Sequence, residues 1–229
     1  MKIGIIVAME EELNSIKKYM NNVIEETIFD ITFYKGYINN VDAVLVKSGI
    51  GKVNAARTTQ LLIDHEKVSY IINIGVAGGV SSKVNVGDII VGKFLVQHDF
   101  DITAFGHERG YITGVGKYIY SDSNLVRIFA NEINKKDYNI LLGGIASGDI
   151  FCNDKDLSLS IQKEFDVDCV EMEGAAIAQV CFLSKIPFVI IRSISDVVNG
   201  NNEVDFEQFL NSSSQVVADL LFNNINKID

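Results

Sequence analysis

Acidic side chains follow three apolar runs of the sequence, and each group could carry out proton-transfer chemistry. The first group is Glu10–Glu12, the second is Glu171 with Glu173, and the third lies within Arg192–Asp196. Carboxyl groups act as general acids and bases when burial or neighbouring charges shift their pKa toward neutrality. Ionised carboxylates also accept paired hydrogen bonds from vicinal hydroxyls, which is the chemistry needed to hold a ribose. The three groups are therefore candidates for acid–base chemistry on a hydroxylated substrate.

Each group also has an explanation that involves no catalysis. Carboxylates in the first turn of a helix complement its dipole, and this alternative applies to Glu10–Glu12 and to Glu173. Because successive helical residues point about 100° apart, Glu10–Glu12 cannot all face one site. Glu171 and Glu173 are two residues apart at a strand end, so both can face the same side. Arg192 and Asp196 end a very apolar strand, where buried charges require partners, so they belong either to a structural Arg–Asp or Arg–Glu pair or to a site.

Two glycine-rich turns and one histidine-containing segment have alternative interpretations. Ser48–Lys52 lacks the spacing of either phosphate-binding glycine motif, and tight turning with helix packing explains it. Gly75–Gly79 follows a strand and is either a plain turn or a place where backbone approaches a ligand. His98, in the segment His98–Gly106, is either catalytic or fixed by a neighbouring carboxylate in a structural loop. No two of the three histidines lie at metal-ligand spacing, so we expect no metal and no cofactor.

Apolar runs alternate with segments of helical periodicity along the chain. Runs rich in β-branched residues predict buried strands at 2–8, 70–74, 88–96 and 188–194. The last helix is predicted to start near Phe206, with Asp205 and Gln208 as its capping box. Sites in such folds gather where strands end, which is where the acidic groups lie. We expect an α/β fold with a mixed sheet covered by helices on both faces, formed by residues 1–229 as one domain.

The composition excludes several classes of partner. A net charge of −10 repels phosphate backbones and anionic lipids, so we expect neither nucleic acid nor a membrane as partner. The three cysteines show no CxxC or Cys/His spacing, which fits free thiols in a reducing compartment. The N-terminal apolar run is too short for a signal peptide, and no run reaches the roughly 20 apolar residues that span a bilayer. We therefore expect a cytoplasmic protein that binds a small molecule.

A series of motifs extends over nearly the whole chain. They are GIIVAMEEE (4–12), SGIGKVNAA (48–56), IINIGVAGG (71–79), VGDIIV (86–91), HDFDITAFG (98–106), SGDIFCN (147–153), VEMEGAAIAQVC (170–181) and PFVIIRSISD (187–196). In order and spacing they resemble the purine nucleoside phosphorylase/nucleosidase superfamily, and specifically its 5′-methylthioadenosine/S-adenosylhomocysteine nucleosidases. The resemblance implies a three-layer α/β/α sandwich around a twisted mixed sheet, and a homodimer with each active site near the interface. It also implies hydrolysis of the N-glycosidic bond of small adenine nucleosides.

The resemblance further implies roles for particular residues. Asp196 would be the general acid that protonates adenine at N7, with Ser195 beside it, and Glu12 would position or activate the attacking water. Glu173 would hold the ribose hydroxyls, supported by the backbone of Met172 and oriented by Arg192. The rest of the pocket would consist of Phe151 stacked on the purine, the Cys152 backbone at its edge, and Ile50, Val76, Ala77 and Gly78. From the partner subunit, Ile102 and Phe105 would line the pocket for the 5′-alkylthio tail.

A few positions depart from the pattern of that family. Val76 stands where serine is usual, which removes a hydroxyl near the acid, and Cys152 stands where an aliphatic residue is common. His107 and Thr113 replace a tyrosine and a proline beside the tail pocket. These differences leave the preferred 5′ substituent open, while the reaction is unaffected.

Two other functions compete with hydrolysis. Phosphorolysis would use phosphate in place of water and needs cations around it, whereas Glu12 on the nucleophile side would repel phosphate. A sensor that binds nucleosides without cleaving them would release no adenine. The presence of both Glu12 and Asp196 argues against the sensor.

Overall fold

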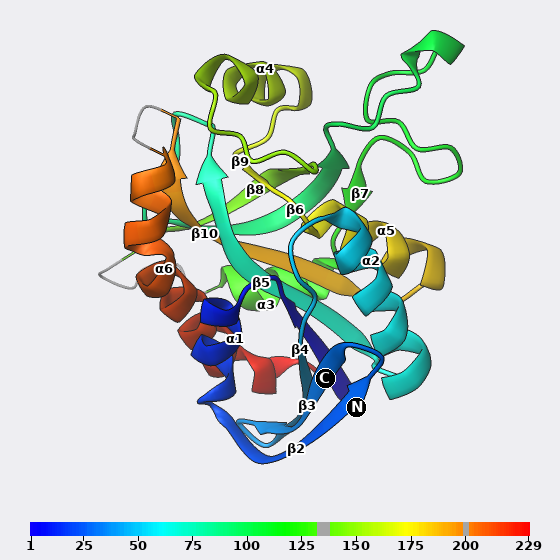
Figure 1. Cartoon of the computed structure of the whole chain (residues 1–229), viewed down its shortest axis with the longest axis vertical. Helices are drawn as coiled ribbons and strands as arrows, with labels where there is room; N and C mark the ends of the chain where they lie inside the picture. Colours follow the sequence, from blue (N-terminus) through cyan, green and yellow to red (C-terminus); the bar gives the residue numbers. More distant parts are fainter. Residues whose placement is uncertain (132–137, 199–201) are drawn as a thin grey trace.

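One mixed sheet with helices on both faces forms the molecule (Figure 1), and the computed structural model describes residues 1–131, 138–198 and 202–229. The strands are β1 (Lys2–Val7), β2 (Met20–Ile28), β3 (Ile31–Ile38), β4 (Val41–Lys47), β5 (Tyr70–Gly79), β6 (Ile89–Gln97), β7 (Ile119–Tyr120), β8 (Ile140–Ser147), β9 (Cys169–Glu171) and β10 (Phe188–Val197). The α-helices are α1 (Glu10–Lys17), α2 (Lys52–Leu61), α3 (Ser123–Ala130), α4 (Lys155–Phe165), α5 (Gly174–Ser184) and α6 (Asn202–Asn224). A π-helical turn at Leu62–Glu66 extends α2.

The sheet brings strands from distant parts of the chain side by side. Its order is β10-β6-β8-β9-β5-β1-β4-β3-β2, with β7 on β6 and a further pairing of β10 with β5. Strand β5 is parallel to both β1 and β10, so the carboxyl ends of these three strands meet at one edge. The antiparallel β2-β3-β4 meander forms the last three strands of the sheet, beyond β1. Three segments that are far apart in sequence therefore end next to one another.

Apolar side chains fill the space on each face of the sheet. On one face, α1, α3 and α6 pack against alternate residues of β1, β5 and β10, with Leu13, Phe129 and Leu220 in the same cluster. On the other face, Ala55 of α2 and Ile177 of α5 pack against the intervening residues of the same strands. Figure 1 shows the two sets of helices on opposite sides of the strands. The predicted α/β class, with a mixed sheet covered on both faces, is confirmed.

Several predicted boundaries are wrong, each for a physical reason. Strand β5 runs through Gly79 and β10 through Val197, because the two strands stay paired as far as Val197 and Gly79. The interpretation of Gly75–Gly79 as a plain turn is therefore wrong. Helix α6 covers residues from Asn202 on, so Asp205 lies within the helix and not at its start. No strand was predicted at β2, because this edge strand is mostly exposed and lacks apolar alternation.

Burial on the central strands predicts where stability resides. Ile5 on β1 is fully buried in the α1/α6 core, whereas Ile24 on the edge strand β2 is 69% exposed. We expect Ile5→Ala to lower the free energy of unfolding by about 2–5 kcal/mol, because it leaves a cavity in a packed core. Ile24→Ala should change it by less than about 0.5 kcal/mol. Urea denaturation followed by circular dichroism measures both, and equal effects would contradict this assignment of the core.

Candidate active site

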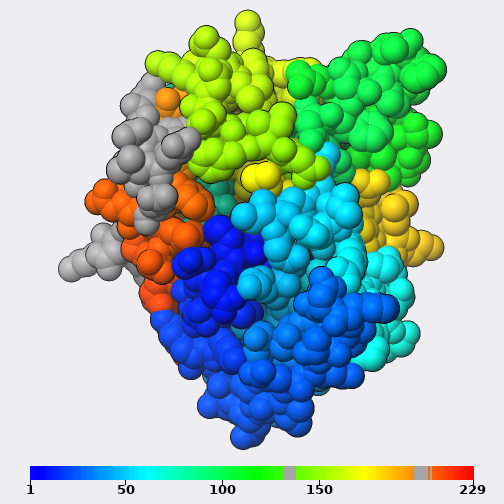
Figure 2. Space-filling view, in the orientation of Figure 1, coloured from blue at the N-terminus to red at the C-terminus, as the bar shows by residue number. Residues whose placement is uncertain are grey.

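A cavity of about 370 Å³ opens where the parallel strands end. Figure 2 shows the surface hollowed between the N-terminal segment with α1 (blue), α2 (cyan), the segment after β8 (yellow-green) and α6 (orange), with yellow atoms at the bottom. The predicted residues that line it are Glu12, Ile50, Val76, Ala77, Gly78, Phe151, Cys152, Met172, Glu173, Ser195 and Asp196. The structure thus brings most of the predicted site together.

Three predicted residues do not line this cavity. Arg192 is fully buried behind it. Ile102 and Phe105 lie in and beside the short 3-10 helix Thr103–Phe105, and Phe105 is 82% exposed. The sequence-based expectation places both residues in the pocket of a partner subunit.

Asp196 lies at an irregularity of β10. The register against β5 shifts between Ile194 and Asp196, which turns the Asp196 side chain into the cavity instead of the sheet pleat. Ser195 donates a hydrogen bond through Oγ to Asp196 Oδ1 at 2.8 Å. On the facing strand, a Cβ on Gly78 would lie 3.1 Å from Asp196 Oδ2, so the glycine leaves room for the carboxyl group. Asp196 is thus almost completely buried yet still reaches the cavity.

Glu12 is the one member of Glu10–Glu12 that turns inward. Its Oε2 accepts hydrogen bonds from the backbone N–H groups of Ala8 (2.8 Å) and Met9 (3.0 Å), and its Oε1 accepts one from Val76 (3.1 Å). Glu10 instead forms an exposed ion pair with Lys47. Burial raises the pKa of Glu12, although the nearby Arg192 charge and the three N–H groups oppose the shift. Glu12 therefore stabilises the start of α1 and also lines the cavity, so the two explanations apply to it together.

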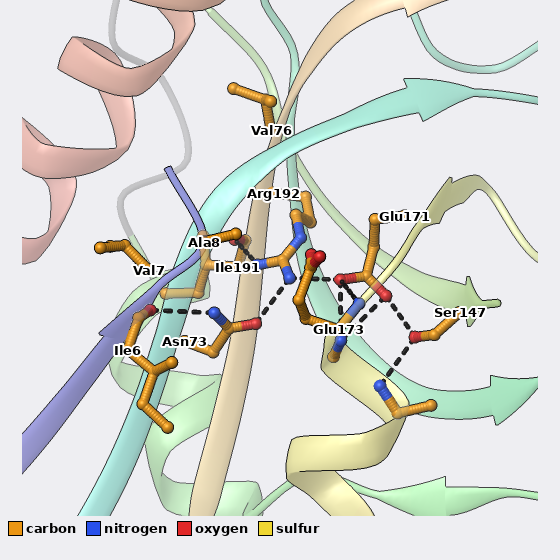
Figure 3. Close-up of polar contacts among 12 residues, drawn as sticks. Ile6, Val7, Ala8, Asn73, Val76, Ser147, Glu171, Glu173, Ile191 and Arg192 are labelled. Atoms are coloured by element: carbon orange, nitrogen blue, oxygen red, sulfur yellow. Dashed lines mark hydrogen bonds and ion pairs between the residues drawn. The ribbon is translucent and has the colours of Figure 1, made fainter. Parts of the chain in front are cut away.

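Arg192 pairs with Glu171, which corrects one prediction. Its Nη2 forms a short ion pair with Glu171 Oε2 and donates to Asn73 Oδ1 at 2.6 Å (Figure 3). No hydrogen bond joins Arg192 to Glu173 within the described residues, so Arg192 does not orient Glu173 directly. The prediction failed because two carboxylates at two-residue spacing compete for one guanidinium, and the backbone path decides which one reaches it.

Glu171 organises the backbone that carries Glu173. Its carboxylate accepts hydrogen bonds from the N–H groups of Glu173 (3.2 Å) and Gly174 (2.8 Å), and a short one from the Ser147 hydroxyl. These contacts fix the start of α5 (Figure 3). Sequence reasoning named Glu171 as a candidate carboxylate but gave it no specific role, and it did not single out Asn73 or Ser147. The detectable signal was Asn73, a polar residue in the middle of the apolar run of β5.

Glu173 faces the cavity with a perturbed carboxyl group. Burial, reinforced by the charge of Glu171, raises its pKa to about 8, against the opposing influence of Arg192. Its Oε1 accepts a hydrogen bond from the backbone N–H of Gly51 at 2.8 Å. Gly51 belongs to the turn Ser48–Lys52, so this turn has a role beyond tight turning and helix packing.

Aromatic and sulfur-containing side chains form the remaining wall. Phe151 meets Phe206 of α6 edge to face, with ring centroids 5.9 Å apart. Cys152 lines the same side of the cavity, and burial raises the pKa of its thiol to about 11, so it is uncharged at neutral pH. Phe206 was not predicted as a site residue.

One cluster outside the cavity has the geometry of a metal site. Among residues 1–131, 138–198 and 202–229, the one group with metal-ligand geometry is Glu26, His65 and Glu66. Lys2 and Lys35 already form ion pairs with Glu66. His98 is buried, and burial lowers its pKa, so it is neutral at pH 7. Within the same ranges, no helix is long and apolar enough to cross a membrane.

Comparisons with known proteins agree with this geometry. Residues 2–225 match the model of the "Phosphorylase superfamily". The chain is 41% identical to a 5′-methylthioadenosine/S-adenosylhomocysteine nucleosidase of Geobacillus sp. over 100% of this chain and 99% of the relative. It is 39% identical to the protein of that name in Bacillus subtilis over the full length of both.

Solved structures show the same fold. A nucleosidase of that name from S. pneumoniae, bound to a transition-state inhibitor, superposes with a TM-score of 0.93 at 35% identity over 100% of both chains. A futalosine hydrolase mutant of Helicobacter pylori superposes with a TM-score of 0.94 at 32% identity over 99% of both. The predicted nucleoside phosphorylase-like fold is confirmed. The chain belongs to the phosphorylase superfamily, in the same family as the 5′-methylthioadenosine/S-adenosylhomocysteine nucleosidases.

Proposed function

We propose that this chain hydrolyses the N-glycosidic bond of 5′-methylthioadenosine and S-adenosylhomocysteine, releasing adenine and the 5-substituted ribose. One observation carries the proposal: Asp196, Glu12 and Glu173 come from three distant segments and line one cavity. All three side chains are buried, so their environments can give each a separate task. The names of the relatives support the choice of substrate.

Asp196 is the proposed general acid. Adenine leaves poorly as an anion, so a proton delivered to N7 lowers the barrier to bond cleavage. Burial favours the protonated form of a carboxyl group, and the Ser195 hydroxyl fixes the orientation of this one. Phe151 and the backbone of Cys152, on the same cavity, would hold the purine in line with Asp196.

Glu173 and Glu12 act on the sugar and on the water. As the bond to adenine breaks, the ribose becomes oxocarbenium-like, and nearby carboxylates stabilise its positive charge. Glu173 would accept hydrogen bonds from the ribose hydroxyls, supported by the Met172 backbone. Glu12, held by three backbone N–H groups, would position and activate the attacking water. The Val76 side chain offers this water no hydroxyl.

The charges around the cavity favour water over phosphate as nucleophile. The titratable carboxyl groups that line it are Glu12, Glu171, Glu173 and Asp196. The cation behind them, Arg192, is already paired with Glu171. A phosphate would therefore meet carboxyl groups instead of the cationic clamp that phosphorolysis requires.

The proposed assembly is a homodimer in which Ile102 and Phe105 complete the 5′-tail pocket of the partner subunit. A phenylalanine as exposed as Phe105 gains stability when another chain covers it. The solved relatives include a futalosine hydrolase as well as nucleosidases, so a panel of 5′-substituted adenosines is the measurement that ranks the 5′ substituents.

Replacing the acid tests the reaction directly. We expect Asp196→Asn to lower kcat for adenine release from methylthioadenosine by roughly 10²–10⁴-fold, because the amide cannot supply the proton. Nucleoside binding, measured by calorimetry, should persist. Asp64→Asn, an exposed change of the same kind on the π-helical turn, is the control. Formation of 5-methylthioribose 1-phosphate in phosphate buffer, or full activity of Asp196→Asn, would contradict the proposal.

The raised pKa of Glu173 predicts the pH profile. The usual pKa of this group is 4.5, and in the folded protein burial raises it to about 8. Because the carboxylate is the form that accepts ribose hydroxyls, kcat/KM should rise with pH through this raised value. Glu173→Gln should remove that limb and lower kcat/KM. A limb below pH 6.5 that survives Glu173→Gln would assign the titration to another group, such as His98.

The exposed Phe105 tests the partner's contribution. We expect Phe105→Ser to raise KM for methylthioadenosine by roughly tenfold, because one apolar contact of the tail is lost, with little change in kcat. Phe29→Ser, an equally exposed phenylalanine at the β2–β3 turn, is the matched control. Analytical ultracentrifugation gives the oligomeric state, and a monomer with full activity would refute the shared pocket.

A further inference from the structure

We propose that a ring of three hydrogen bonds joining Lys52, Asp99 and Asp149 sets the spacing between Glu173 and the purine side of the cavity. These three are positioning residues, since none lines the cavity. The inference rests on the proposed function, because it concerns how that site is held together. We call this feature the Lys52–Asp99–Asp149 ring.

The ring closes across three separate segments. Lys52 Nζ donates to Asp99 Oδ1 at 2.6 Å, the Asp149 N–H donates to Asp99 Oδ2 at 2.9 Å, and the Lys52 N–H donates to Asp149 Oδ1 at 2.8 Å. Lys52 starts α2, Asp99 follows β6 and Asp149 follows β8. The Lys52 and Asp99 side chains are only 17% and 19% exposed, so solvent screens their ion pair weakly. Although burial raises the pKa of Asp99, the Lys52 ammonium and the Asp149 N–H hold it below its usual value.

Lys52 occupies a place where a cation is unfavourable. It is the first residue of α2, and the first turn of this helix carries no acidic residue to offset the dipole. A local rule broken in this way is typical of functional positions, where another interaction compensates. Here Asp99 supplies the compensating charge from a different segment.

On the ribose side, the ring continues directly into Gly51. The Gly51 N–H donates to Glu173 Oε1, and the next N–H along the chain, that of Lys52, donates to Asp149. Gly51 has φ = 99°, and a Cβ there would lie 3.2 Å from Asp149 Oδ1. The turn that reaches Glu173 is therefore held from the opposite side by Asp149.

On the purine side, the ring continues into the wall of the cavity. Asp149 is followed at once by Ile150, Phe151 and Cys152, all of which line the cavity. The neighbouring Gly148 N–H donates to the Glu171 carbonyl at 3.1 Å. One set of contacts thus fixes the ribose carboxylate and the purine wall relative to each other.

Lys52→Met tests the ring, because it removes the ammonium but keeps the backbone N–H. We expect kcat/KM for methylthioadenosine to fall on the order of 10- to 100-fold at neutral pH, as for the loss of hydrogen bonds to charged groups. The rising limb of the pH profile should also move to higher pH, because the Gly51 N–H lowers the pKa of Glu173 and is held less firmly once the ring is broken. The other charged groups that face Glu173, namely Glu171, Arg192 and Glu12, are unchanged in this variant.

Three further variants separate positioning from loss of folding. Lys52→Arg keeps the cation and should restore the profile, whereas Asp99→Asn should reproduce the effect of Lys52→Met. Lys47→Met removes the same charge from an exposed ion pair and is the matched control. A loss of folded protein would lower the activity at every pH without moving the limb.

Hydrogen exchange tests the Lys52–Asp99–Asp149 ring in the absence of substrate. In Lys52→Met, peptides covering 48–53 and 148–153 should both exchange faster than in the unaltered protein. Unchanged exchange in both peptides, or an unchanged pH profile in folded Lys52→Met and Asp99→Asn, overturns the proposal. If the unaltered protein releases no adenine, the proposed function fails, and the exchange experiment still decides whether the ring holds the two segments.

Discussion

A single buried guanidinium organises the carboxyl groups of this cavity. Arg192 is fully buried, and its charge acts on Glu171, Glu173 and Glu12. Burying one positive charge is costly unless it is paired, and Glu171 provides the partner through a short ion pair. Glu12 and Glu173 form no hydrogen bond with Arg192 in the described residues, and backbone N–H groups hold both carboxyl groups where they line the cavity. The chemistry proposed for the site depends on Arg192 pairing with Glu171 and not with Glu12 or Glu173.

The sheet determines that these groups meet at all. Strands β1, β5 and β10 are parallel neighbours, so the residues that follow or end them lie at one edge. Glu12 enters from the helix after β1, and Asp196 from the end of β10. The backbone between them, Gly75–Gly78 on β5, passes close to both carboxyl groups. A Cβ on Gly75 would lie 2.7 Å from Glu12 Oε1, so the glycine-rich end of β5 makes the space that the two acids occupy.

Environment then gives similar side chains different properties. Glu12 is held by three backbone N–H groups and Glu173 by one, although both are buried. Desolvation raises a carboxyl pKa, and each hydrogen bond to the charged form opposes that shift. Proteins separate the acid from the base among neighbouring carboxyl groups by such differences. The carboxyl groups of one cavity therefore lie in different surroundings.

Local patterns in the chain were enough to predict the α/β class, the buried central strands and the acidic groups at the strand ends, whereas most of the cavity lining came from the resemblance to a family. Apolar β-branched runs and strand-end carboxylates are visible without any knowledge of contacts, and the ordered motifs indicated the family. Folding decided which of Glu10–Glu12 turns inward, that Arg192 pairs with Glu171 instead of Glu173, and that Gly51 contacts a carboxyl group 122 residues away. The reason is that a hydrogen bond depends on distance and direction between atoms. Those are set by which strands become neighbours, and local sequence does not contain that information.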